Sequence, residues 1–219
     1  MKTAFIFDFD GTIGETIPLV LSAIESAYAD MGLTAPSREV IQSNFGPNER
    51  GLCQRLFPDS KEKAETLYQR YLFHYEAQHD KFSPRPFTGI RVALKTLSEN
   101  RIPIGIVTGK GDDSAKISLL KYDIVDLFSV IECGSERGAI KPEKIKAVLD
   151  AWKTTPEQTR VYYVGDAVSD VYDSLEAGVV PVSAGWSDLA DVSALKKTPT
   201  TKIFDSVLDF RNWILSEII

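Results

Sequence analysis

The chain has 219 residues, 43% of them hydrophobic and 26% charged, and its 31 acidic and 25 basic side chains give a formal net charge of −6. This composition argues against disorder, collagen-like repeats and coiled coils. The length suits one α/β domain with an insertion or two small domains. Because nucleic-acid coats and binders of anionic membranes need basic surface, we expect neither as a partner.

The sequence says less about the cellular location and the oligomeric state of the protein. No apolar run approaches the ~20 residues that span a bilayer. The N-terminal residues MKTAFIFDFDGT lack the features of a signal peptide, so we expect a cytoplasmic protein. Cys53 and Cys133 are too few for a disulfide scaffold, and we expect buried free thiols. The sequence shows no clear assembly signature, which leaves a monomer or a homodimer open.

The first elements in chain order are one strand and then several helices. Residues 3–9 form an apolar run that predicts a buried strand. Residues 15–86 contain no convincing strand, and their apolar spacing and capping residues predict about four helices. Within the longest of them, Tyr68, Tyr71 and Tyr75 share one face and are expected inside this insertion. His74 and His79 lie on the same predicted helix, and we expect surface or packing roles for them.

Strands and helices alternate through the rest of the chain. Apolar runs at 102–108, 128–132, 161–164 and 179–183 predict strands, with helical patterns between most of them. This alternation predicts a parallel sheet covered by helices on both faces. The fold class is therefore α/β, with a Rossmann-like core of residues 1–14 and 87–219 and an inserted α-helical cap domain of residues 15–86.

The first predicted strand ends in two carboxylates, Asp8 and Asp10. Side chains one residue apart on a strand point to the same face, so these two acids would lie together. Two neighbouring carboxylates repel each other unless a cation or a shared proton lies between them. An acidic turn without function is the simpler interpretation of this pair.

Polar residues also follow the other predicted strands. Individually they have simpler interpretations, such as a helix cap or a surface lysine. Because the carboxyl ends of parallel strands meet at one edge of a sheet, we expect these side chains to meet Asp8 and Asp10 there. The residues concerned are Thr108, Gly109, Lys141, Asp166 and Asp170.

These residues and their order resemble the haloacid dehalogenase (HAD) superfamily of hydrolases and phosphotransferases. DFDGT is similar to its first motif, Thr108 in IVTGK to its second, Lys141 in IKPEK to its third and GDAVSD to its fourth. The helical insertion between the first two motifs resembles the family's type 1 cap. The overall pattern is similar to the phosphoglycolate phosphatase-like subfamily. Two positions depart from many members of this subfamily. They have aspartate where this chain has Glu15, and they read KPxP where residues 141–144 of this chain read KPEK.

The resemblance implies a Mg²⁺-dependent phosphatase that works through an aspartyl-phosphate. Asp8 would be the nucleophile and Asp10 the general acid and base. Thr108, Gly109 and Lys141 would hold the phosphoryl group. The metal site would consist of Asp8, Asp166, Asp170 and the carbonyl oxygen of Asp10, because Mg²⁺ prefers oxygen ligands.

The expected substrate is a small phosphorylated metabolite, with a compound like phosphoglycolate as one candidate. Arg50 lies in a segment that resembles the cap's specificity loop and would pair with a second anionic group of the substrate. Glu15 is the other candidate for specificity. A phosphomutase of the β-phosphoglucomutase type is the alternative, although Thr12 favours a phosphatase. A non-catalytic binding protein is a further alternative, but it would not need to keep both Asp10 and Lys141.

Overall fold

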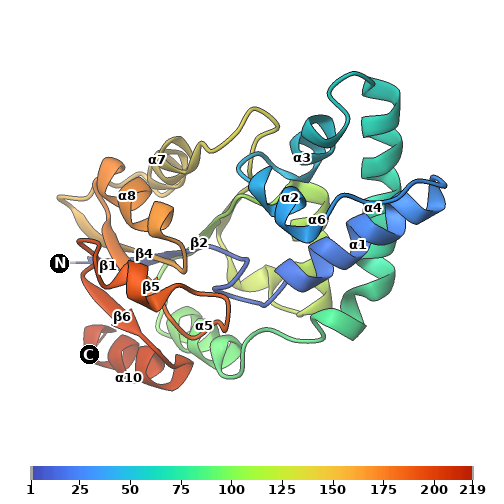
Figure 1. Cartoon of the computed structure of the whole chain (residues 1–219). Helices are drawn as coiled ribbons and strands as arrows, with labels where there is room; N and C mark the ends of the chain where they lie inside the picture. The colour runs from blue at the N-terminus through green and yellow to red at the C-terminus, as the bar shows by residue number, and fades with distance from the viewer. Residues whose placement is uncertain (1, 219) are drawn as a thin grey trace.

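The computed structural model describes residues 2–218 and contains a six-stranded parallel sheet flanked by helices (Figure 1). The strand order is β3-β2-β1-β4-β5-β6, and every neighbouring pair is parallel. This architecture confirms the α/β fold predicted from the sequence. The strands are β1 (Lys2–Phe7), β2 (Ile104–Val107), β3 (Val130–Glu132), β4 (Thr159–Gly165), β5 (Val180–Ala184) and β6 (Lys202–Phe204).

The central strand β1 is apolar on both sides because helices cover both faces of the sheet. Its alternating side chains divide between two hydrophobic clusters, with Phe5 and Phe7 in one and Ala4 and Ile6 in the other. The first cluster contains residues of α5 and α10, and the second contains residues of α7 and of the segment that follows α8. These helices are α5 (Ile90–Glu99), α7 (Lys141–Ala151), α8 (Val168–Glu176) and α10 (Val207–Ile218).

Four helices, α1–α4, form a separate unit beside the sheet, as the right-hand part of Figure 1 shows. This α1–α4 unit has its own hydrophobic cluster, in which Tyr68, Tyr71 and Tyr75 are buried as predicted. Ser60 accepts a hydrogen bond from the amide of Lys63 and so begins the longest helix. The helices are α1 (Ile17–Asp30), α2 (Arg38–Ser43), α3 (Glu49–Leu56) and α4 (Lys61–Phe82).

Some element boundaries differ from the predictions. The first strand ends at Phe7 rather than at residue 9 because the carbonyl oxygen of Phe9 accepts the amides of Thr12, Ile13 and Gly14 in a tight turn. Sequence patterns did not predict β6, α9 (Val192–Leu195) or α10. The connecting elements α6 (Asp112–Lys121) and the 3₁₀ helix η1 (Val125–Leu127) complete the fold.

Other single residues follow the expectations. Cys53 and Cys133 are buried free thiols. His74 pairs with Asp30, whereas the buried His79 bonds Ser118.

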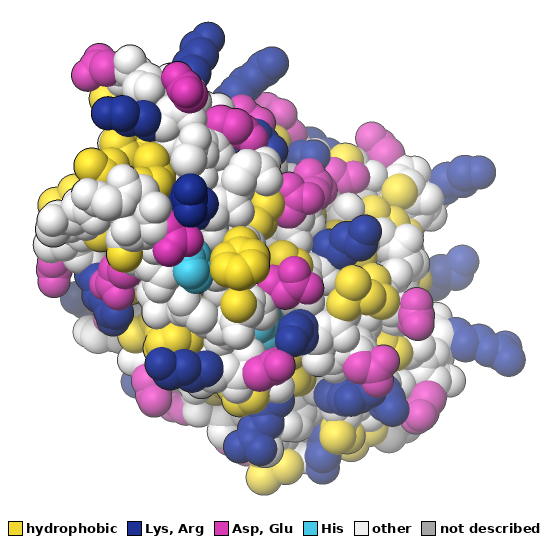
Figure 2. Space-filling view, turned by 90° about the vertical axis from the view of Figure 1, so that its right-hand side faces the viewer, with side chains coloured by type: hydrophobic (Ala, Val, Ile, Leu, Met, Phe, Trp, Pro, Cys, Tyr) yellow, Lys and Arg dark blue, Asp and Glu magenta, His cyan; other side chains and the backbone are white. Residues whose placement is uncertain are grey.

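Within residues 2–218, no helix combines the length and the apolar character needed to cross a membrane. The face seen in Figure 2 carries interspersed acidic and basic side chains.

Candidate active site

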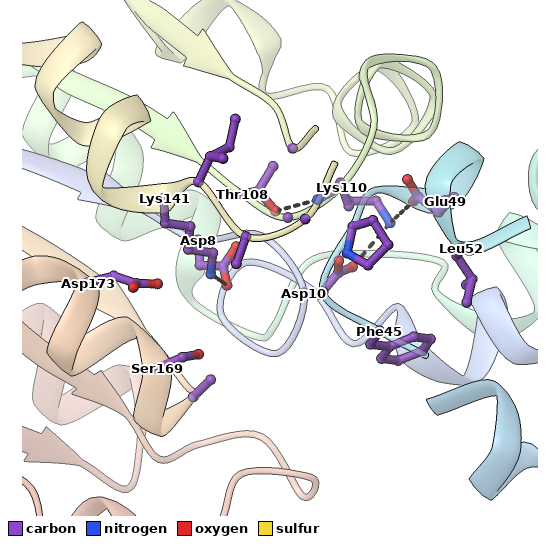
Figure 3. A pocket seen from close by; sticks show the side chains of 18 of the residues that line it. Asp8, Asp10, Phe45, Glu49, Leu52, Thr108, Lys110, Lys141, Ser169 and Asp173 are labelled. Carbon is purple, nitrogen blue, oxygen red and sulfur yellow. Dashed lines mark hydrogen bonds and ion pairs between the residues drawn. The ribbon is translucent and has the colours of Figure 1, made fainter. Parts of the chain in front are cut away.

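A cavity of about 370 Å³ lies between the carboxyl ends of the central strands and the α1–α4 unit (Figure 3). Asp8 and Asp10 follow β1, Thr108 follows β2, and Asp166 follows β4. All four line the cavity because parallel strands end at the same edge of the sheet. The remaining predicted residues that line it are Gly109 and Lys141.

Lys141 connects two buried carboxylates at the floor of the cavity. Its Nζ lies 2.6 Å from Asp8 Oδ2 and 2.5 Å from Asp170 Oδ1. Burial by itself lowers the pKa of Lys141, but Asp170 and Asp8 together hold that pKa well above its usual value. Burial raises the pKa of Asp170, and the charge of Lys141 opposes this effect. The lysine therefore stays charged and fixes the Asp8 carboxylate.

Asp8, Asp166 and Asp170 form a cluster of oxygen donors. One carboxylate oxygen from each lies within 4.8 Å of the others, a spacing that can hold a metal ion. Burial, followed by the charges of Asp8 and Asp170, raises the pKa of Asp166 to about 8. A cation among these oxygens would offset this repulsion, and an all-carboxylate donor set suits a hard cation such as Mg²⁺.

The turn after β1 allows Asp166 to come close to the chain. Gly11 has a positive φ of 72°, and a Cβ atom at this residue would lie 2.2 Å from Asp166 Oδ2. Any larger residue would therefore be strained and would also displace a carboxylate of the cluster.

Asp10 shares the cavity with Asp8 but has a different cation as its partner. Its carboxylate accepts a hydrogen bond from Thr16 and pairs with Lys110 Nζ at 3.1 Å. Burial raises the pKa of Asp10, while Lys110 and then Thr16 oppose the shift. From the sequence, both carboxylates were expected on one strand face; instead, they follow the strand and belong to two separate ion pairs.

Two charged residues of the cavity, Lys110 and Glu49, were not predicted from the sequence. Lys110 is 2% exposed, and its Nζ lies 3.5 Å from Glu49 Oε1. Glu49, at the start of α3, also accepts hydrogen bonds from Gly111 N at 2.6 Å and Ser114 Oγ at 2.5 Å. The position of Lys110 directly after Thr108 and Gly109, at a strand end, was the available signal.

Two hydrogen bonds of Thr108 fix the loop after β2. Thr108 is 1% exposed, and its amide donates to the carbonyl oxygen of Glu132 at 3.1 Å. Its hydroxyl oxygen accepts the amide of Lys110 at 3.3 Å. This loop holds Thr108 and Gly109 in the wall of the cavity.

The two residues predicted to set specificity do not line the cavity. Arg50 pairs with Glu65 and, at 3.7 Å, with Glu136, and its guanidinium lies 4.1 Å from the ring centroid of Tyr68. These partners hold Arg50 on the outer side of α3, so the structure does not place it against a substrate.

Glu15 likewise is not among the residues that line the cavity. It accepts a hydrogen bond from the hydroxyl of Ser187 at 2.5 Å, and burial raises its pKa. Its partner comes from the loop after β5, which sequence spacing alone does not bring to residue 15.

The parallel sheet and the carboxylate–lysine cavity at its edge define a hydrolase of the kind that the four motifs predicted. The family profile described as haloacid dehalogenase-like hydrolase matches residues 5–184. The chain therefore belongs to this family and is an enzyme.

Individual relatives agree with this assignment. A phosphoglycolate phosphatase from Agrobacterium fabrum is 27% identical over 191 residues, which cover 84% of this chain and 82% of that protein. Pyrophosphatase PpaX from Halalkalibacterium halodurans is 28% identical over 184 residues, 83% of each chain. The crystal structure of a predicted phosphoglycolate phosphatase from Haemophilus somnus superposes with a TM-score of 0.79 at 21% identity, covering 97% of each chain, and shows the shared fold.

Proposed function

We propose that the protein is a Mg²⁺-dependent phosphatase that hydrolyses a small phosphorylated metabolite through an aspartyl-phosphate on Asp8. The observation that carries this proposal is the Asp8 carboxylate, which lies in the cavity with Lys141 Nζ at 2.6 Å. The names of the two relatives, a phosphoglycolate phosphatase and a pyrophosphatase, support hydrolysis of a phosphate ester or anhydride. A cytoplasmic location and a monomeric or dimeric state stay predictions.

The proposed reaction has two steps. First, an oxygen of Asp8 attacks phosphorus, the bond from phosphorus to the substrate oxygen breaks, and Asp10 gives its proton to that oxygen. Second, Asp10 takes a proton from water, the water oxygen attacks phosphorus, and the bond to Asp8 breaks, which releases phosphate. Burial raises the pKa of Asp10, which suits a group that must carry a proton in the first step.

The phosphoryl group would be held by residues on both sides of Asp8. The hydroxyl of Thr108 and the backbone amide of Gly109 would donate to its oxygens, and Lys141 would offset its charge. Such fixed donors and charges supply most of the catalysis in phosphoryl transfer.

The carboxylates of Asp8, Asp166 and Asp170 and the carbonyl oxygen of Asp10 would hold Mg²⁺. The bound cation would reduce the repulsion between Asp8 and an anionic phosphate. The shared cluster of the three carboxylates supports this assignment.

Residues 15–86 would act as a cap that opens and closes over the cavity, with hinges near residues 14–16 and 84–88. In the structure the α1–α4 unit is docked: Asn48 N donates to Ser135 O at 2.9 Å, and Asn48 Nδ2 donates to Gly134 O at 3.2 Å. Opening would also break the bonds that join Glu49 to Lys110, Gly111 and Ser114.

Hydrolysis of 4-nitrophenyl phosphate with Mg²⁺ tests the proposal. Asp8→Asn should lower kcat by about 10³-fold or more because the amide is a poor nucleophile. Asp173→Asn is the matched control, since Asp173 lines the same cavity without a role in the mechanism, and should stay within about threefold of the wild type. Full activity of Asp8→Asn would refute the covalent mechanism. Detection of free phosphate by ³¹P NMR with sugar phosphates separates hydrolysis from phosphomutase activity.

A further inference from the structure

We infer that the natural substrate is a phosphate monoester of an uncharged, largely apolar alcohol, so that its leaving group carries no second anion. This inference rests on the proposed phosphatase function. It concerns the side of the cavity beyond Asp10, where the α1–α4 unit forms the wall.

The wall beyond Asp10 is apolar. Figure 3 shows Phe45 and Leu52 on the side of Asp10 that is remote from Asp8 and Lys141. Because Asp10 would protonate the leaving oxygen, the organic part of the substrate must extend to this side. The apolar side chains that the α1–α4 unit contributes to the cavity are Ile17, Val20, Phe45, Pro47 and Leu52.

The charged groups of the cavity leave no surplus positive charge for a second anion on this side. Lys110 lies between Asp10 at 3.1 Å and Glu49 at 3.5 Å, with its side chain 1% exposed. These three groups sum to a formal charge of zero when Asp10 is protonated and to −1 when it is ionised. An anion placed here would therefore meet neutral or negative surroundings.

The other cations that line the cavity are also paired. Lys141 is bound to Asp8 and Asp170 and belongs to the phosphoryl site. Lys144 pairs with Glu132 at 2.8 Å. Within the described residues, these two and Lys110 are the only basic side chains that line the cavity.

Neither Arg50 nor the start of α3 supplies the missing charge. Arg50 is held outside the cavity by Glu65 and Glu136. At the start of α3, Asn48 Oδ1 accepts the amide of Gly51, and the amide of Asn48 donates to Ser135. A carboxylate or phosphate on the leaving group would thus lose water against apolar side chains without a counter-charge, which disfavours its binding.

The proposed substrate differs from those in the names of the relatives in the charge on its leaving group. Phosphoglycolate carries a carboxylate on its leaving group, and pyrophosphate carries a second phosphate. An apolar alcohol matches the wall by burying its carbon surface against it.

Three synthetic esters with leaving groups of similar size test the inference: 4-methylpentyl phosphate, 4-phosphooxybutanamide and 4-phosphooxybutanoate. We expect kcat/KM with Mg²⁺ to be highest for the alkyl ester and at least about tenfold lower for the carboxylate than for the amide, equivalent to ~1.4 kcal/mol. Equal or better turnover of the carboxylate, with the Asp8→Asn variant inactive, would overturn this inference alone. Absence of Asp8-dependent turnover of all three esters would overturn the inference, and the proposed function would fall with it only if 4-nitrophenyl phosphate were not hydrolysed either.

A second experiment places a positive charge in the apolar wall. Leu52→Lys should raise the ratio of kcat/KM for the carboxylate ester to kcat/KM for the amide ester by about tenfold, because it adds the missing cation. Leu52→Met should leave this ratio at its wild-type value. An unchanged ratio in a folded Leu52→Lys protein would count against the apolar wall as the selective element.

Discussion

Lys110 Nζ lies 3.1 Å from Asp10 Oδ1, and the lysine side chain is almost entirely buried. On its other side the same ammonium group faces Glu49 of the α1–α4 unit. One buried cation therefore joins the proposed proton donor at the sheet edge to the helices that cover it. The position of Asp10 and the docking of α3 thus depend on the same lysine.

Glu49→Ala should destabilise the protein by ~2–3 kcal/mol, since it leaves Lys110 with one fewer counter-charge and the amide of Gly111 without an acceptor. Urea unfolding would measure this loss. The neighbouring Arg50→Ala is the control and should cost less than ~1 kcal/mol, because the pairs of Arg50 are partly exposed. It should also leave KM within about twofold of the wild type. A larger effect of Arg50→Ala than of Glu49→Ala would contradict the structure.

Lys141→Met should reduce kcat by about 10²-fold or more, because Asp8 loses the cation that fixes it. Without metal, the variant should also lose ~3 kcal/mol of stability, since Asp8 and Asp170 then lie together uncompensated. Lys144→Met, one turn further along α7, removes a partly exposed pair with Glu132 and should change stability by less than ~1 kcal/mol. Thermal unfolding in EDTA would compare the two variants, and equal losses would argue against a special role of Lys141.

Addition of Mg²⁺ should raise the Tm of the wild-type protein, because a ligand that binds the folded state stabilises it. Asp166→Asn should abolish most of this increase. In EDTA, however, this variant should be at least as stable as the wild type, since burial and the charges of Asp8 and Asp170 raise the pKa of Asp166 to about 8. Differential scanning calorimetry with and without Mg²⁺ would show both effects. A wild-type increase that persists in Asp166→Asn would place the metal elsewhere.

His79 should make the protein sensitive to acid. Burial, assisted by Lys110 and Lys121, lowers the pKa of His79 to about 4 from its usual 6.5. Between these values the unfolded chain binds more protons than the folded one, so stability falls as the pH decreases from 6.5 towards 4. Urea unfolding at pH 7 and pH 4.5 should show that His79→Gln removes ~2 kcal/mol of this loss. His74 pairs with Asp30 near the surface, so His74→Gln should lose as much stability between pH 7 and pH 4.5 as the wild type does. Equal pH slopes for the wild type and His79→Gln would disprove the assignment.

Much of the site was predictable because local patterns determine it. The continuous apolar run of β1 requires a sheet with two covered faces, and parallel strands then bring Asp8, Thr108 and Asp166 to one edge. Helical spacing likewise predicted the burial of Tyr71 and Tyr75 in the α1–α4 unit. The short strand β6 was missed because three residues carry too little periodicity to be recognised.

The sequence by itself determined the order of the first five strands, the buried faces of the predicted elements and the set of polar groups at the strand ends. Only the tertiary structure decided how the long charged side chains pair. Arg50 turns outward because Glu136, a residue of the loop after β3, lies beside it. Lys110 turns inward because Glu49 of a distant helix and Asp10 meet it there. Such choices depend on the charges that neighbouring elements bring into reach, and no local pattern records which elements become neighbours.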